Sequence, residues 1–365
     1  MPKNFLNNPT KKSQLGFSLL EMIVSITIFI IITGAIYGLL QVGRIDRNRA
    51  SRRSDMLKNA RTAIHLIGRD VLNAGMGYHR RGAVVPDNFI STRLGTPADA
   101  DNERDFLTSI IVGNNLETNS LNADSTARTD FISFAYRDLT FNSGNNLSLS
   151  NVAVLSGSPQ TAQLTTSAGQ AAASKVYDLY LIESDSSQIA VMASGVPNTN
   201  TLNIAPGDPL GLNQPFDGAG VDGSMLKKCT VVITENCTTY LASAKKFTWV
   251  AYKVKPDGTL VRLIFGNNTG RPANEQIQEQ PLAYGVQNIQ FRYVLEDGTT
   301  VENPTLGIDN LPGTTDDQPL DANRIRQITV TLEVQSNEID EQTKKAAVIT
   351  LNATFSVRNL EYDAG

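Results

Sequence analysis

Residues 16–42 read GFSLLEMIVSITIFIIITGAIYGLLQV, and Glu21 is the one charged residue among them. At about 1.5 Å per residue, a helix of this length reaches across the roughly 30 Å hydrocarbon core of a bilayer. A carboxylate near the start of such a segment is costly in lipid, so it indicates a function and requires a partner. The stretch therefore predicts a membrane-spanning helix in which Glu21 has a role.

The residues before this run are basic, with Lys3, Lys11, Lys12 and no acid. A secretory signal would have a shorter apolar region followed by a small-residue cleavage site. Here the apolar run leads directly into charged sequence. We therefore expect the apolar segment to remain in the mature protein.

The sequence KKSQLGFSLLEM at residues 11–22 resembles the class III leader of type IV pilins and type II secretion pseudopilins. The resemblance implies that prepilin peptidase cuts between Gly16 and Phe17 and that Phe17 is then N-methylated. Glu21 becomes the fifth mature residue, whose carboxylate pairs with the N-terminal amine of a neighbouring subunit. This agrees with the need of a lone carboxylate in lipid for a cation. The alternative is a plain signal-anchor helix with Glu21 near the interface.

A second apolar pattern follows the membrane segment. Its members recur at spacings of three and four, as on one face of a helix; they are Leu57, Ala60, Ile64, Ile67 and Val71. Gly75 and Gly77 then supply a stop, because glycine is favoured just past a helix C-terminus. We predict one helix from about residue 17 to about residue 74.

The resemblance divides the chain into a leader (1–16), a transmembrane and filament-core helix (17–42), an amphipathic continuation (43–75) and a β-rich head (76–365). It implies an α+β fold of the pilin type. In that fold a long N-terminal hydrophobic helix packs on a large, mainly antiparallel β-sheet head with loop insertions.

The most similar group is the PilW-type minor pilins. Four segments carry this narrower resemblance, namely 64–75, 282–293, 324–332 and 354–360. Residues 80–280 match no such pattern, so the ligand of the head stays open. Whether the subunit belongs to a pilus or a secretion system also stays open.

Five arginines follow the apolar run, accompanied by one acid, Asp46; they are Arg44, Arg47, Arg49, Arg52 and Arg53. By the positive-inside rule they would place the C-terminal bulk in the cytoplasm. The resemblance implies the opposite, with the leader cytoplasmic and the head periplasmic. We follow the resemblance because the peptidase site must face the cytoplasm. The arginines then form a solvated helix face, lie at the outer headgroup layer or face acidic neighbours in an assembly. A stripe that contacts DNA is a further alternative.

Strands are expected where β-branched and aromatic residues recur between turn signals. The predicted strands are 130–136, 176–182, 188–193, a hairpin at 246–265, 286–295, 324–335 and 346–359. The hairpin turns at Lys255-Pro256-Asp257-Gly258, a sequence with turn chemistry. Three regions are predicted as mostly loop: 80–128, 156–174 (a mobile loop or weak hairpin) and 195–224.

Cys229 and Cys237 have seven residues between them, which suits a disulfide in an oxidising compartment. Two buried free thiols are the alternative. The acids Asp208, Asp217 and Asp222, and Asp316, Asp317 and Asp321, prompt a calcium hypothesis, but solvated turn acids are the simpler interpretation. His65 and His79 with two cysteines do not make a zinc spacing, so no metal site is predicted.

The composition gives 41% hydrophobic residues and a net charge of −4, which argues against a protein that coats nucleic acid. No Gly-rich phosphate loop or nucleophile elbow stands out, so we predict no enzyme and no cofactor. We predict a minor pilin in the tip or the assembly-initiating complex of a type IV pilus. Its implied partners are prepilin peptidase, other minor and major pilins, the inner-membrane assembly platform and, before assembly, the lipid bilayer. A large J-like pseudopilin of a type II secretion system and a membrane-anchored adhesin or DNA-uptake receptor are the alternatives.

Overall fold

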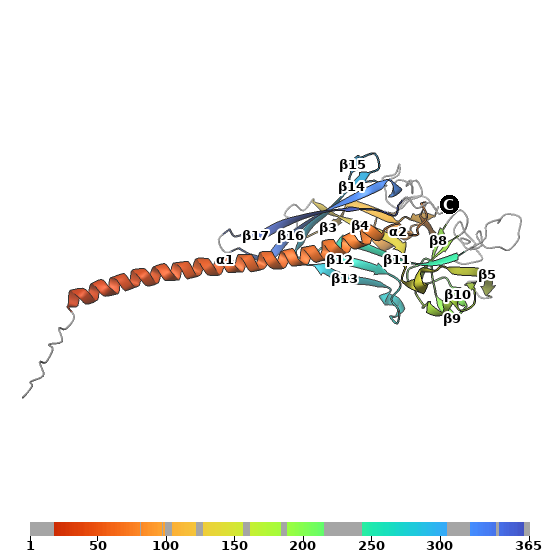
Figure 1. Cartoon of the computed structure of the whole chain (residues 1–365), viewed down its shortest axis with the longest axis horizontal. Helices are drawn as coiled ribbons and strands as arrows, with labels where there is room; N and C mark the ends of the chain where they lie inside the picture. The colour runs from red at the N-terminus through yellow and green to blue at the C-terminus, as the bar shows by residue number, and fades with distance from the viewer. Residues whose placement is uncertain are drawn as a thin grey trace, which may run out of the picture. The chain divides into compact units, whose positions relative to one another are not determined.

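The structure is a computed structural model that describes residues 18–80, 82–96, 98, 104–121, 127–155, 161–183, 188–214, 243–304, 322–340 and 343–360. The chain forms two compact units, Met1–Ser54 and Asp55–Gly365. A long helix, α1 (Leu19–Asn73), is followed by strands that make a mainly antiparallel head (Figure 1). The predicted α+β class, with a long N-terminal apolar helix and a mostly antiparallel sheet, is confirmed.

The two ends of α1 are set by local hydrogen bonds and by one glycine. At the start, the backbone N–H of Met22 donates to the Ser18 carbonyl over 3.1 Å. At the end, Gly75 adopts a φ of 79°, which favours glycine. A Cβ at Gly75 would also lie 2.7 Å from Leu360 Cδ2, so the site excludes a side chain. The expected helix of about 17–74 thus agrees with the observed bounds, although Phe17 lies outside the described residues.

The strands all belong to the second unit, and β1–β8 is the parallel pair among the described pairings. Their bounds are β1 Ala83–Val85, β2 Asp105–Leu107, β3 Ile110–Thr118, β4 Arg128–Arg137, β5 Leu147–Leu155, β6 Thr161–Thr166, β7 Leu179–Glu183, β8 Gln188–Met192, β9 Gly195–Asn198, β10 Thr201–Ile204, β11 Ser243–Val254, β12 Leu260–Phe265, β13 Ile277–Ala283, β14 Val286–Leu295, β15 Thr300–Val301, β16 Ile325–Ile339 and β17 Ala346–Ser356. The short helices are α2 Phe89–Leu94, η1 Phe141–Gly144, η2 Gln170–Ala173 and η3 Ala273–Glu275.

These strands form two sheets. In the larger, of 13 strands, one path runs β2-β1-β8-β7-β11-β5-β6-β10-β9, and β11 also pairs with β4 and β12. The smaller sheet has the order β15-β14-β16-β17. The long strand β11 is therefore the hub of the larger sheet, because its two halves pair with different neighbours.

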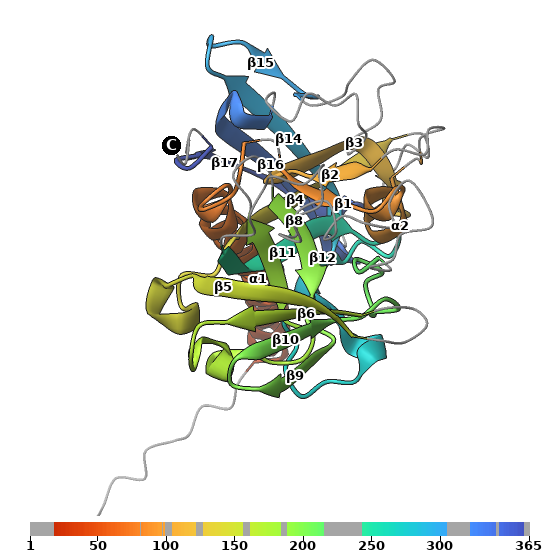
Figure 2. The ribbon, with the colours of Figure 1, turned by 90° about the vertical axis from the view of Figure 1, so that its right-hand side faces the viewer.

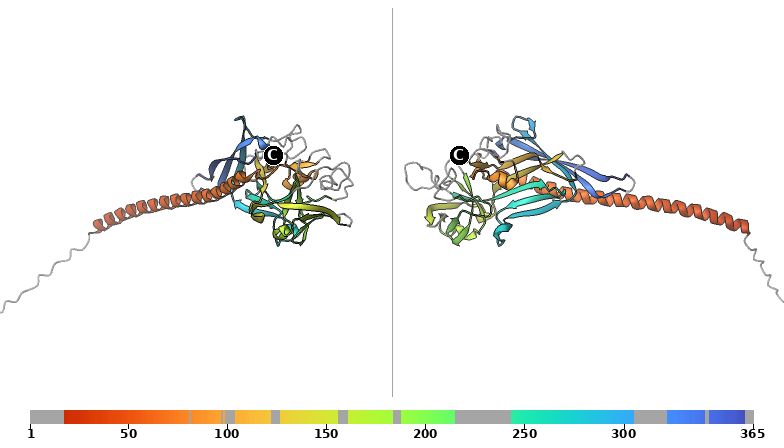
Figure 3. Two further views of the ribbon diagram at one scale, coloured as in Figure 1. Left: turned by 45° about the vertical axis from the view of Figure 1, so that its right-hand side comes forward. Right: turned by 180° about the vertical axis from the view of Figure 1, so that it is seen from behind.

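The last part of α1 lies between the four-stranded sheet and strands β11–β13 (Figures 1 and 3). Ala60, Ala63 and Ile67 of α1 are fully buried and share one core with alternate residues of β4, β11, β14 and β16. Small alanines on the helix allow close approach to the sheets, and the branched residues of the strands fill the remaining space. The predicted stripe is confirmed, with the half-buried Leu57 and Ile64 at its margin.

The opposite face of the larger sheet has a core of its own. The Trp249 ring stacks on Phe265 with 3.8 Å between ring centroids, and its Nε1 donates to Ser133 Oγ over 2.7 Å. A third core lies among β5–β8 and β10. Figure 2 shows β5, β6 and β10 of this group one below another. Because β4 and β11 are covered on both faces, their central stretches, FISFAY and WVAY, are mostly apolar instead of alternating.

The strands predicted with turn signals are confirmed. The hairpin at 246–265 is β11 paired with β12, and Gly258, with a φ of 79°, closes its turn by donating to the Lys255 carbonyl. The prediction at 286–295 coincides with β14, and 188–193 with β8 paired to β7. The final two predicted strands are β16 and β17.

The predicted loop regions are in part wrong. Residues 80–128 contain β1, α2, β2 and β3. Residues 161–166 form β6, whose antiparallel pairing with β5 agrees with the weak-hairpin alternative for 156–174 and not with a mobile loop. Strands β9 and β10 lie within 195–224. These strands are short or rich in Thr and Asn, so pairing with neighbours, not local propensity, makes them strands. The strand predicted from Val176 begins at Leu179 instead, because Tyr177 adopts a φ of 72° in a turn.

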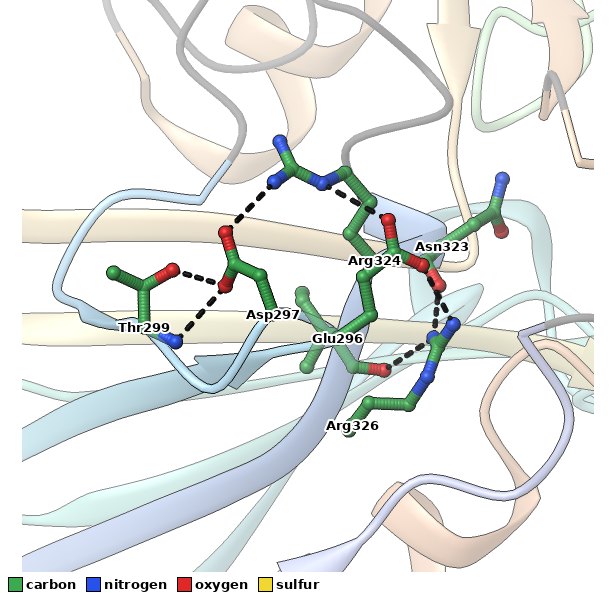
Figure 4. A network of polar contacts seen from close by, with 7 residues as sticks. Glu296, Asp297, Thr299, Asn323, Arg324 and Arg326 are labelled. Atoms are coloured by element: carbon green, nitrogen blue, oxygen red, sulfur yellow. Dashed lines mark hydrogen bonds and ion pairs between the residues drawn. The ribbon is translucent and has the colours of Figure 1, made fainter.

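A polar network connects the turn after β14 to the start of β16 (Figure 4). Arg324 reaches Glu296 over 3.4 Å and Asp297 over 3.4 Å, while Arg326 reaches Glu296 over 2.9 Å. Asp297 also accepts hydrogen bonds from Thr299. The acids of the network are exposed and its arginines are half-buried, so it holds the turn after β14 against the start of β16 at the surface of the head.

Candidate assembly and anchoring helix

The first part of α1 is apolar and exposed on all sides. Every residue from Leu19 to Arg44 is exposed, including Ile23, Phe29 and Leu40. Among the helices that the structure describes, α1 is the one that is long and apolar enough to cross a membrane. A helix that is hydrophobic all round requires lipid or other helices around it. This segment therefore fits membrane anchoring.

Glu21 lies in the first turn of α1, and its residue is exposed. A carboxylate at this end of a helix is favoured by the partial positive charge of the free N–H groups. Gly16 and Phe17, the predicted cleavage and methylation residues, lie outside the described residues.

The second part of α1 buries one stripe, and Asp70 is its charged member. The side chains of Met56, Ala60, Ala63, Ile67 and Val71 are the apolar members. The Asp70 residue is fully buried. A buried carboxylate is costly unless it is paired and hydrogen-bonded, so its contacts must satisfy it.

Four side chains satisfy the Asp70 carboxylate. Arg262 of β12 donates from Nε and NH2 to Oδ2, each over 2.9 Å, and Tyr252 of β11 donates its hydroxyl to Oδ2 over 2.6 Å. Tyr136 of β4 donates to Oδ1 over 3.0 Å, and Arg69 donates to Oδ1 over 3.2 Å. The buried Arg262 balances the charge of Asp70, whereas the Arg69 side chain is half exposed to solvent. The network ties the end of α1 to three adjacent strands. We call these five residues the Asp70 network.

Burial and charge act together on the pKa values in the Asp70 network. Burial raises the pKa of Tyr252, and the Asp70 carboxylate raises it further, so the hydroxyl remains a donor. Burial acts to lower the pKa of Arg262, but the Asp70 carboxylate together with Tyr252 and Tyr136 outweighs burial, and the pKa is raised. The network thus holds a charged guanidinium and neutral tyrosines together.

Sequence reasoning did not identify the Asp70 network, although one signal was present. Asp70 follows Ile67 by three residues and precedes Val71, so it lies within the apolar stripe. An acid on a buried face indicates a partner. The partners Tyr136, Tyr252 and Arg262 are 66 to 192 residues away, and periodicity does not reveal such distant pairings.

A second buried carboxylate, Asp130 of β4, joins β3 to β14. Its Oδ1 accepts the backbone N–H of Asn115 and its Oδ2 accepts that of Phe291, each over 2.8 Å. Burial raises the pKa of Asp130 to about 6 against the opposing effect of these two hydrogen bonds. Asp130 therefore crosslinks the two sheets that enclose the second part of α1.

The remaining predicted site residues fall in different places. Cys229 and Cys237 lie outside the described residues, as do Asp217, Asp222, Asp316, Asp317 and Asp321. Asp208 is described, and its carboxylate accepts the backbone N–H groups of Leu210, Leu212 and Asn213. It therefore orders a turn. Within the described part of the chain no cluster of three or more His, Cys, Asp or Glu side chains is arranged to hold a metal ion.

The N-terminal part of the chain matches a known protein family. A family described as the prokaryotic N-terminal methylation motif matches residues 11–37. The match spans Gly16, Phe17 and Glu21 together with most of the apolar run. It supports a pilin or pseudopilin subunit that is processed by prepilin peptidase and assembles with other pilins. No curated protein matched the chain.

Proposed function

We propose that this chain is a minor pilin, a structural subunit of the tip or assembly-initiating complex of a type IV pilus. The methylation motif at 11–37, continued by a helix that is apolar on all sides, carries the proposal. The PilW-type segments and the size of the head, at residues 76–365, favour a minor over a major pilin.

The proposed pathway begins in the inner membrane, with leader 1–16 cytoplasmic and the head periplasmic. Prepilin peptidase cleaves the Gly16–Phe17 bond, and the new N-terminus of Phe17 is methylated. The helix of residues 17–42 then waits in the bilayer. On assembly its lipid contacts are exchanged for neighbouring helices, and Glu21 pairs with the N-terminal amine of another subunit. No step requires a catalytic group or cofactor in this chain.

The processing step is tested by the variant Gly16→Leu, which places a large side chain at the scissile bond. We expect the protein to accumulate as uncut precursor beginning at Met1, as measured by intact mass. The matched control Gly34→Leu leaves the bond unchanged and should yield mature protein. Normal amounts of Phe17-initiated protein in the Gly16 variant would contradict the proposal.

The assembly step is tested by Glu21→Gln, which keeps the shape of the side chain and removes its charge. We expect normal cleavage but at least about tenfold less of the subunit in sheared pili, because the amine loses its counter-ion within an apolar surrounding. Asp46→Asn on the same helix is the control and should co-assemble normally. Equal amounts of the Glu21 variant and wild-type chain in pili would remove the pairing argument.

The J-like pseudopilin of a type II secretion system would share the leader and the helix, so a deletion strain separates the two. Loss of surface pili with intact protein secretion supports the minor pilin. Loss of secretion with normal piliation supports the pseudopilin.

We also propose a disulfide between Cys229 and Cys237, in keeping with a periplasmic head. Peptide mapping of the non-reduced protein should show the two cysteines in one crosslinked fragment. Alkylation of both thiols in the purified protein without reductant would contradict the disulfide.

A further inference from the structure

The segment between the apolar run and the head is strongly basic. Residues 43–54 read GRIDRNRASRRS and carry five arginines and one aspartate, a formal net charge of +4. Residues 55–365, by contrast, hold 24 Lys or Arg against 34 Asp or Glu. We call Arg44, Arg47, Arg49, Arg52 and Arg53 the arginine collar. An anionic surface would therefore repel the net charge of the head and attract the collar.

The arginine collar surrounds the helix instead of lying on one face. All its members lie within α1, and at about 100° per residue they are spread over about 240° of the circumference. Arg44, Arg47 and Arg53 are exposed, whereas Arg49 and Arg52 are half-buried. Arg49 also lies 3.9 Å from the Asp46 carboxylate on the same helix. One protein surface would reach one side of such a collar, while a layer of anions around the helix reaches every side.

The position of the collar along the helix fits the headgroup layer of a bilayer. At 1.5 Å per residue, its members lie about 3 to 17 Å beyond Val42, where the apolar run ends. The headgroup region on each side of the hydrocarbon core is about 5–8 Å thick, and electrostatic attraction extends about 8 Å further at physiological salt. Guanidinium groups bind phosphate oxygens by paired hydrogen bonds, which suits this depth.

We propose that the arginine collar binds the phosphates of anionic phospholipids on the side of the membrane that faces the head. This proposal rests on the proposed function in one respect, namely that the subunit is anchored in the membrane before assembly. It also accounts for the conflict with the positive-inside rule, because arginines that hold lipid phosphates outside are ligands and need not direct topology. The apolar helix fixes the depth of the subunit, and the collar fixes the level at which its head begins.

The test uses the full chain in nanodiscs of equal phosphatidylglycerol and phosphatidylcholine. Lipids retained on the protein after gentle detergent extraction are counted by native mass spectrometry. We expect phosphatidylglycerol to be enriched about fivefold over phosphatidylcholine on the wild-type chain. Replacing all five collar arginines with Gln should reduce that enrichment to less than about twofold, and 0.5 M NaCl should weaken it in the wild type.

Two further variants isolate the collar. Lys3, Lys11 and Lys12→Gln measures the contribution of the leader and should leave most of the enrichment in place. A charge-matched control changes five exposed basic residues of the head, namely Arg128, Lys175, Lys344, Lys345 and Arg358, to Gln and should retain it. Circular dichroism checks that each variant is folded.

Equal retention of the two lipids by the wild type would overturn the proposal. So would enrichment that survives in the collar variant, or that the head control loses as well. An acidic protein surface as the true partner would appear as collar-dependent binding of another subunit without lipid enrichment, which also overturns it. Because no outcome depends on cleavage or pilus assembly, its failure is distinguishable from failure of the proposed function.

Discussion

The two parts of α1 differ both in the pattern of their residues and in their surroundings. From Leu19 to Arg44 every residue is exposed, whereas from Met56 to Val71 one stripe is buried between two sheets. The first part has apolar residues in all directions, so it has no preferred face and suits lipid or neighbouring helices. The second part has a face, so it suits the core of its own chain. The comparison teaches that one helix can serve two partners when its periodicity changes along its length.

The largest effect on the second part of α1 is expected from removing the negative charge of Asp70, which holds this part to the sheet. Asp70→Asn leaves the Arg262 guanidinium buried without its carboxylate, and we expect a loss of about 3–5 kcal/mol in the free energy of unfolding. Urea unfolding of the full chain in detergent, followed by fluorescence of Trp249, the one tryptophan, measures it. Trp249 is buried in the head, so its signal reports the second unit.

Asp55→Asn is the matched control for Asp70, since Asp55 is exposed on the same helix. Its effect should remain within about 0.5 kcal/mol. If the two variants unfold at the same urea concentration, the Asp70 network does not stabilise the head.

The stability of the two sheets around the second part of α1 should also depend on pH, because Asp130 connects these sheets. Its pKa is raised from 3.8 to about 6 in the folded chain, chiefly by burial. A raised pKa means that the folded state holds the proton more tightly than the unfolded state does. The resulting stabilisation is complete below about pH 4 and is lost as the pH rises through 6. Between pH 4 and pH 7 we expect a loss on the order of 2–3 kcal/mol from this group.

Asp130→Asn isolates this contribution, because the amide does not titrate. The difference in unfolding free energy between wild type and variant should shift with pH in favour of the variant as the pH rises. Other carboxylates titrate equally in both chains and cancel. A difference that stays constant from pH 4 to pH 7 would show that Asp130 has an ordinary pKa.

A pair of identical substitutions sharpens the comparison within the helix itself. A Cβ at Gly68 would lie 2.2 Å from the Phe355 ring, whereas a Cβ at Gly38 meets nothing within 4 Å. Gly68→Ala should therefore cost about 1–2 kcal/mol as Phe355 is displaced from the helix. Gly38→Ala should cause no loss, since alanine favours helix by about 0.5–1 kcal/mol.

Urea unfolding measures the Gly68 effect, and helicity by circular dichroism measures the Gly38 effect. The same sign for both variants would mean that the two parts of α1 do not differ in their packing.

The sequence predicts those elements of the fold whose structure is determined by residues close together in the chain. An apolar run followed by an apolar stripe predicted α1. The turn sequence Lys255-Pro256-Asp257-Gly258 predicted the β11–β12 hairpin. For strand β6, with the sequence TAQLTT, the sequence left a mobile loop and a weak hairpin open, because its strand conformation comes from pairing with β5 and β10. Of the candidate site, Glu21 stands out from its apolar neighbours alone, but the Asp70 network required knowledge of which strands lie beside the end of α1. A buried charge can be suspected from one segment, whereas its partners are a property of the whole fold.

The Asp70 network has a mechanical consequence. Traction on the apolar part of α1, as when a subunit is drawn out of a bilayer, is transmitted along the helix to its final turns. There the load passes through one carboxylate to Tyr136, Tyr252 and Arg262 on three hydrogen-bonded strands. Strand β11 is hydrogen-bonded to both β4 and β12, so a pull on the carboxylate is opposed by three paired strands instead of one.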